Sequence, residues 1–193
     1  RRWLARLPNT PKSLGQFDVS GKSELAARWT GGWQSFLQPG RGKPASLQAR
    51  LQIPALALRL DGQSAEQTLR LRDVDTELGG SPEALTFKTR AQVSRSGQEL
   101  QLRADGRGGR NGRGDWRANI DHLQMQAKAP QIPGPWALVL NKPLELRWSA
   151  ATTPGRGPAR RVGAGQASLT GPQAGVLALD LQPVVWDSGG RTS

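Results

Sequence analysis

The sequence predicts an all-β protein, built as one elongated, curved antiparallel sheet with long Gly/Pro/Arg-rich loops and little helix. The first observation behind this prediction is alternation, because apolar and polar residues exchange places with period two through most of the chain. Such a segment puts its apolar side chains on one face of a strand and its polar side chains on the other. The second observation is that turn-forming residues interrupt the alternation at short intervals, as at Asp61-Gly62 and Ser96-Gly97.

A third observation predicts curvature. In three segments the apolar residues move from one parity to the other partway along the segment, and these segments are 47–60, 69–78 and 116–127. One inserted residue reverses the two faces unless the strand bulges at that point. Bulges at similar positions of neighbouring strands would curl the sheet into a trough. Plain turns are the alternative, although Pro54 and the Asp121-His122 pair are weak hairpin signals.

The first predicted strand covers residues 17–29, in which Val19, Leu25 and Trp29 share one parity. The helix formers at 24–27 make a helix the competing interpretation. We prefer the strand because the alternation holds along the segment and Gly31-Gly32 ends it.

Further strands are predicted wherever the alternation resumes, and the cleanest of them is 85–93. Turns are expected at 79–82 and 130–135, a single helical turn at Phe36-Leu37, and mobile loops at 106–114 and 152–165. The strands expected after the first are 47–60, 69–78, 85–93, 100–104, 116–127, 136–148 with a break at Asn141-Lys142-Pro143, 167–169, 177–181 and 184–186.

The chain is interpreted as a single elongated segment, 1–193, of a longer protein. It opens on Arg1 rather than Met, and no apolar run reaches the ~20 residues that a membrane-spanning helix needs. An anchor or export signal is therefore expected outside this sequence. There is no cysteine, so disulfides and thiolate chemistry are excluded.

The charge balance points to anionic partners. Lys and Arg number 27 against 15 acidic residues, which gives a net charge of +12. This excess favours attraction to nucleic acid, lipid head groups or lipopolysaccharide. However, the tryptophans at 29, 116, 136 and 148 share the parity of the apolar residues, so we interpret them as groove or core residues rather than as a platform for stacked bases. No nucleic-acid partner is predicted, and the arginines are assigned to a solvated face.

Catalytic motifs are absent from the sequence. His122 is the only histidine, so a histidine-based metal cluster is excluded, and its place beside Asp121 predicts an exposed bend. Gly15 and Gly21-Lys22-Ser23 resemble a phosphate loop, but five residues separate the glycines where the motif needs four. No catalytic residue, metal site or cofactor is predicted.

A repeated pattern carries a family resemblance. Gly114-Asp115-Trp116-Arg117 and Gly134-Pro135-Trp136 each precede alternating apolar residues, and Pro143-Leu144-Glu145-Leu146-Arg147-Trp148 closes the second run. Together with Trp-Thr-Gly-Gly-Trp at 29–33 and the closing segment 169–183, these runs resemble the middle region of the translocation and assembly module TamB family. The resemblance extends over nearly the whole chain. The related AsmA-like proteins share the alternating style and remain an alternative.

The resemblance implies a non-enzymatic periplasmic protein of a Gram-negative bacterium. Its parent chain would be anchored in the inner membrane by a missing N-terminal part and would engage an Omp85-type outer-membrane protein through a missing C-terminal part. Members of this family fold as an elongated, U-shaped sheet with an apolar concave face. They are implicated in passing phospholipid between the two membranes and in outer-membrane protein assembly.

The residue pattern agrees with a lipid groove, since an exposed apolar strip normally marks a binding surface. Each buried methylene of an acyl chain would contribute about 0.8 kcal/mol, while the head group stays in water beside arginines. The residues expected to line the groove and contact phospholipid acyl chains are Leu51, Leu58, Leu71, Phe87, Ala91, Leu102, Trp116, Ile120, Trp136, Leu138 and Leu146.

Three other interpretations stay open. A closed β-sandwich or barrel with an ordinary core would serve as a structural or adhesion module and would bind no lipid. A chaperone-like sheet would pair its edges with unfolded outer-membrane strands and support outer-membrane protein or autotransporter assembly without lipid transport. A basic nucleic-acid binder would lose affinity steeply with salt. An enzyme is the least favoured class.

Overall fold

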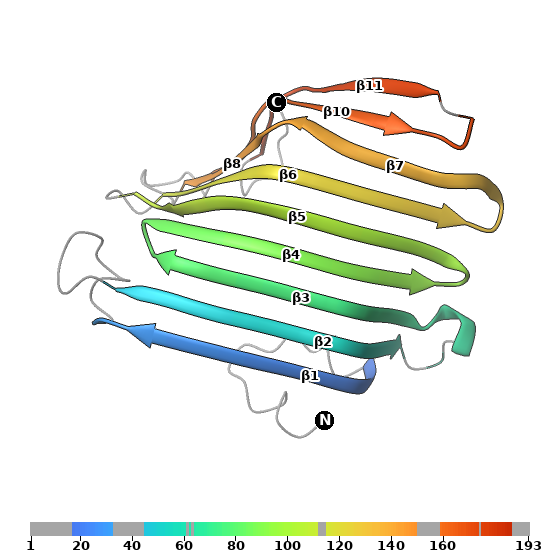
Figure 1. Cartoon of the computed structure of the whole chain (residues 1–193), viewed down its shortest axis with the longest axis horizontal. Coiled ribbons are helices and arrows are strands. Elements are labelled where there is room, and N and C mark those ends of the chain that lie inside the picture. Colours follow the sequence, from blue (N-terminus) through green and yellow to red (C-terminus); the bar gives the residue numbers. More distant parts are fainter. Residues whose placement is uncertain are drawn as a thin grey trace.

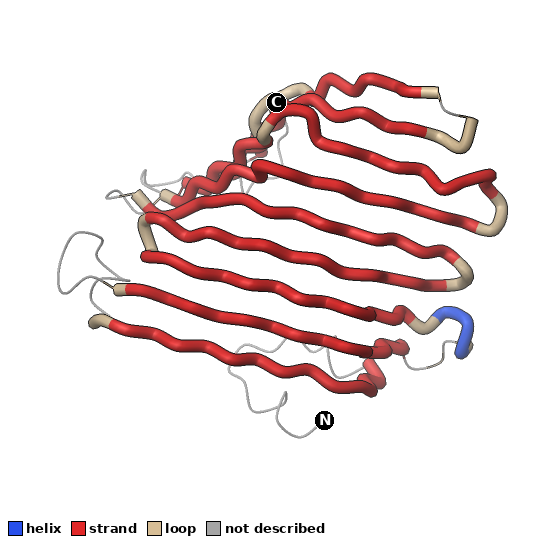
Figure 2. The backbone as a smooth tube through the Cα atoms, viewed as in Figure 1, coloured by secondary structure: helices blue, strands red, loops and turns tan. Residues whose placement is uncertain are grey.

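The computed structural model describes residues 17–32, 45–60, 62, 64–111, 115–149, 159–173 and 175–186. In this part of the chain the all-β prediction is confirmed: twelve strands form one antiparallel sheet, and the one helical element is the short turn η3 (Ala65–Gln67) (Figure 2). The strands are β1 (Phe17–Thr30), β2 (Ser46–Leu60), β3 (Leu69–Ser81), β4 (Ala84–Arg95), β5 (Gln98–Arg110), β6 (Trp116–Ala129), β7 (Ile132–Lys142), β8 (Leu144–Ser149), β9 (Ala159–Val162), β10 (Gly165–Thr170), β11 (Val176–Leu181) and β12 (Val184–Trp186).

Strands that are consecutive in sequence lie side by side over most of the sheet. The pairing order is β1 to β7 and then β10 and β11, as Figure 1 shows. Beyond β6 the sheet forks, because β7 pairs with residues 124–129 of β6 whereas β8 pairs with residues 116–120. β9 and β12 extend the β8 branch. The sheet is open, since β1 and β11 lie at its two ends and no ladder joins them in the described residues.

The three changes of parity are bulges within continuous strands, so the alternative of plain turns is wrong. Each bulged strand carries one unpaired extra residue, at Pro54 on β2, at Asp73 on β3 and at Asp121 on β6. Asp73 has a φ of 49°, which is the left-handed conformation common in bulges. His122 consequently lies in the middle of β6 rather than in a bend between strands. The bulges keep the apolar face continuous along strands of 13 to 15 residues.

Two predicted loops are partly strand. Residues 106–110 complete β5, although their composition predicted a mobile loop. The glycines fit there because the partner strands come very close: a Cβ built on Gly106 would lie 2.1 Å from the backbone oxygen of Asn119 and 2.8 Å from the ring of Phe87. Such covering of a strand glycine by an aromatic ring is a known way to stabilise sheets. Residues 159–162 form β9 inside the second predicted loop.

The remaining sequence predictions on local structure have mixed outcomes. The strand interpretation of residues 17–29 is confirmed by β1, which runs through Gly21 without a break. The turn expected at 79–82 is shorter than predicted, because β3 extends to Ser81. The helical turn at Phe36-Leu37 and parts of the two predicted loops, at 112–114 and 152–158, lie outside the described residues.

Little of the described chain is buried. The buried apolar side chains are Ala45, Pro82, Leu140 and Ala167, and the buried polar one is Thr68. Domains usually bury an apolar sheet face against a second layer, but the described strands all belong to one sheet. Within the described residues, no helix is long and apolar enough to cross a membrane.

Candidate functional site

The register of the sheet collects the apolar side chains into rows that run across the strands. In one row Ala91 of β4 lies opposite Leu102, which lies opposite Met125 and then Leu138 of β7. The same row continues to Leu169 and Leu177 on β10 and β11, so it crosses six strands. Directly opposite side chains in an antiparallel pair are close enough to pack together. The rows therefore form one continuous apolar surface.

All eleven residues predicted to line a groove lie on this surface, which we call the apolar face. Leu58 and Leu71 lie on it to one side of the bulges, and Leu51 and Phe87 lie on it to the other side. Without the bulges, the change of parity would turn one of these two groups to the opposite face of the sheet. Most of these side chains are half-buried, and Trp136 is exposed. By strand they are Leu51 and Leu58 on β2, Leu71 on β3, Phe87 and Ala91 on β4, Leu102 on β5, Trp116 and Ile120 on β6, Trp136 and Leu138 on β7, and Leu146 on β8.

The apolar face has members beyond the eleven predicted residues. Trp148, interpreted from the sequence as a groove or core residue, lies opposite Trp116 and is 51% exposed. Leu25 lies opposite Leu51 and is 71% exposed; its parity could have added it to the predicted groove. Val162 lies opposite Leu146, but no pattern could have found it, since β9 falls in a Gly/Pro/Arg-rich segment.

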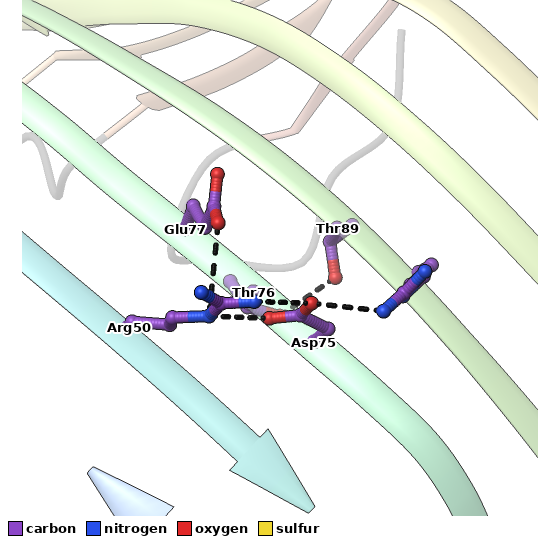
Figure 3. Close-up of polar contacts among 6 residues, drawn as sticks. Arg50, Asp75, Thr76, Glu77 and Thr89 are labelled. Carbon is purple, nitrogen blue, oxygen red and sulfur yellow. Dashed lines mark hydrogen bonds and ion pairs between the residues drawn. The ribbon is translucent and has the colours of Figure 1, made fainter. Parts of the chain in front are cut away.

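The opposite face of the sheet carries ion pairs between neighbouring strands (Figure 3). Asp75 of β3 lies between two arginines, 2.9 Å from Nη2 of Arg50 on β2 and 3.1 Å from Nη2 of Arg90 on β4. The hydrogen bond from Arg50 is the main cause that lowers the pKa of Asp75. Thr76, the next residue along β3, points to the apolar face and shares a 2.7 Å hydroxyl contact with Thr89. The ion pairs of Asp75 join three neighbouring strands and so stabilise the sheet. They also make this second face, the polar face, charged.

His122 is also part of this polar face. Its Nδ1 lies 2.8 Å from Oδ2 of Asp105, and the hydrogen bond, together with the negative charge of Asp105, raises the pKa of His122 above its ordinary value. The imidazole is 77% exposed, so the surroundings are those of a surface ion pair. Among the described residues no cluster of His, Cys, Asp or Glu could hold a metal ion.

The apolar face deepens at one end, where β8 and β9 branch from β6. A cavity of about 380 Å³ lies there, and we call it the end pocket. Its apolar lining includes Phe87, Leu146 and the two tryptophans Trp116 and Trp148. At its rim the guanidinium carbon of Arg160 lies 5.0 Å from the centre of the Trp148 ring, which is cation–π distance. The arrangement can accept an alkyl chain and an anionic group side by side.

The comparisons with known proteins give no match: no family model, no curated protein and no solved structure corresponds to this chain.

Proposed function

We propose that the protein is a lipid conduit without enzymatic activity, in which phospholipid acyl chains lie along the apolar face. The observation that carries this proposal is the extent of that face. One of its rows crosses six strands, yet only four apolar side chains of the described residues are buried. Large exposed apolar surfaces on proteins are normally binding surfaces.

Acyl chains suit this surface chemically. Each methylene removed from water contributes about 0.8 kcal/mol, so a chain of ordinary length would be held without any polar contact. Because the contacts are apolar and repeat from row to row, an acyl chain that moves from one position to the next loses little binding free energy. Passive sliding along the face is therefore the transport mechanism that we propose.

The cellular setting of the proposal rests on the sequence resemblance to the TamB family. In that setting the chain is a middle segment of a periplasmic protein that spans the distance between the two membranes of a Gram-negative cell. An inner-membrane anchor and an Omp85-type outer-membrane partner would belong to other parts of the parent chain.

A second function, strand-pairing support of outer-membrane protein assembly, is favoured by the end of the sheet at β11. This strand pairs with β10 alone among the described strands, and Val176 and Leu177 are 67% and 58% exposed. An apolar edge strand is a template for pairing with another extended chain. A protein acting only in this way would carry no lipid.

The decisive experiment is native purification of the 193-residue chain from a Gram-negative host, followed by mass spectrometry of extracted lipid. Phospholipid should co-purify with the wild-type chain. Phe87→Glu and Ile120→Glu place a charge in the middle of the apolar face and should abolish lipid capture. Leu25→Glu places a charge on the same face at a side chain that is already 71% exposed, so this variant should lose lipid without a loss of folding.

The matched control is Gln92→Glu, which adds the same charge on the polar face of β4 and should retain the wild-type amount of lipid. Circular dichroism would verify that all four variants keep their strand content. Lipid capture that persists in the folded apolar-face variants would refute the conduit. A stable lipid-free wild-type chain that pairs with unfolded outer-membrane proteins would favour the second function instead.

A further inference from the structure

The end pocket differs in charge from the rest of the apolar face. Four arginines occur among the residues that line it, and no acidic residue does. Arg117 and Arg147 both contact Glu145 on the other face of the sheet, at 3.1 and 2.8 Å. No carboxylate of the described residues forms an ion pair with Arg160, whose guanidinium lies over the ring of Trp148. Arg161 lies opposite Arg147 and so belongs to the polar face beside Glu145. Arg160 is therefore the arginine that adds positive charge to the apolar lining of the pocket.

The geometry points to a site that selects lipids by head-group charge. We propose that the end pocket binds the glycerol-proximal part of one acyl chain of a phospholipid with a net-negative head group, and that Arg160 binds the head-group phosphate. This inference rests on the proposed function, since it assigns a preferred lipid and a point of entry or exit to the same apolar face.

Trp148 and Arg160 are suited to the boundary between an acyl chain and its head group. Trp116 on β6, Trp148 on β8 and Arg160 on β9 lie opposite one another in one row. Arg160 also lies opposite Trp186 on β12, so it is flanked by tryptophan positions on both neighbouring strands. Tryptophan favours boundaries of this kind because its ring is apolar and its N–H is polar. An arginine stacked on an aromatic ring still presents its edge donors, which match a phosphate in pairs.

The size of the pocket limits what it holds. A volume of about 380 Å³ is near the lower end of the range of about 300–1,000 Å³ that small-molecule sites cover. A whole two-chain phospholipid exceeds this space, so the remainder of the molecule must lie elsewhere. Phe87 lines the pocket and also belongs to the long apolar face, where it lies opposite Leu78 and Gly106. A chain that starts in the pocket can therefore continue along the face.

The test compares two short-chain phospholipids with identical acyl chains, dihexanoyl phosphatidylglycerol and dihexanoyl phosphatidylcholine, below their micelle concentrations. Isothermal titration to the 193-residue chain should give about tenfold tighter binding of the anionic lipid, the ratio that about 1.4 kcal/mol provides. Arg160→Gln should weaken phosphatidylglycerol binding and so reduce this preference. Phosphatidylcholine should lose less affinity, because it carries the same phosphate but also a choline cation that the guanidinium repels. Arg160→Lys should keep part of the preference, because it retains the charge but loses the paired donors.

Arg70→Gln is the matched control, since it removes an exposed arginine from the polar face of β3 and should leave the preference intact. Inorganic phosphate provides a further arm: it should compete only weakly, because it lacks the acyl chain. Equal binding of the two lipids by the wild-type chain, or loss of preference in Arg70→Gln as well, would overturn the head-group site while leaving the conduit standing. Failure of both lipids to bind would refute the conduit itself.

Discussion

His122 and Asp105 form the exposed pair whose behaviour with pH follows most directly from the contacts. The hydrogen bond to Asp105 and the charge of that carboxylate raise the pKa of His122. A raised pKa in the folded state means that the pair stabilises the fold fully below about pH 6.5, the ordinary pKa of histidine, and that this contribution is lost as pH rises through the folded-state value. The urea midpoint of the wild-type chain should therefore fall as the pH rises from about 6.5 through the folded-state pKa of His122.

Asp105→Asn isolates the effect. The variant should bring the pKa of His122 back towards its ordinary value and should weaken the pH dependence of the urea midpoint. Because His122 is the only histidine, its imidazole gives a single resolved NMR titration that reports the shift directly. Equal His122 titration curves in the two proteins would contradict the pairing.

Among the elements, β3 shows most clearly how one residue controls the path of a strand. Asp73 occupies the bulge with a φ of 49°, a conformation that aspartate tolerates and β-branched residues avoid. Asp73→Val should lower the free energy of unfolding by about 1–2 kcal/mol, the usual cost of a left-handed residue. Asp73→Gly should change it little, because the relief of strain is offset by the greater freedom of the unfolded chain. Urea denaturation measures both variants.

The control for this prediction is Arg70→Val, which places the same side chain at an exposed position of β3 with extended geometry and should stay within about 0.5 kcal/mol of the wild type. If Asp73→Val were as stable as Arg70→Val, the bulge would not be fixed by Asp73. An increase in stability for Asp73→Val would contradict the left-handed conformation itself.

The strands themselves were largely readable in the sequence because each depends on local alternation. The changes of parity at Pro54, Asp73 and Asp121 could be located from the pattern, and they coincide with the bulges. The end of β5 could not be predicted from the pattern, because its glycines and arginines show no alternation of apolar and polar residues. Gly106 is strand only because Phe87 and Asn119 of the neighbouring strands enclose it.

The fork of the sheet could not be predicted from the sequence either. β10 pairs with β7 across the β8–β9 insertion, and such non-adjacent pairing depends on tertiary packing rather than on the pattern of either strand. The apolar face could be predicted because its members share strand parity. The end pocket could not, since it requires β9 to pair with β8 and bring Arg160 opposite Trp148.

At the scale of the whole molecule, the open sheet has an unusual balance of stabilising terms. Strand pairing joins neighbours along the chain from β1 to β7, whereas burial of apolar side chains, the main favourable term in most folds, is left incomplete in the described residues. A ligand that covers the apolar face would supply the missing burial. Lipid binding and stability should therefore be linked in this protein.

This linkage gives a prediction for the thermal stability of delipidated protein. A ligand that binds only the folded chain stabilises it by about 2.7 kcal/mol at a concentration one hundred times its Kd. For a chain of this size that corresponds to an increase in Tm of about 5–11 °C. Delipidated wild-type chain titrated with submicellar dihexanoyl phosphatidylglycerol should show this rise by circular dichroism, whereas Leu25→Glu together with Ile120→Glu should not. A Tm that does not change with lipid concentration would mean that the lipid does not bind the folded chain, and would contradict the proposed conduit.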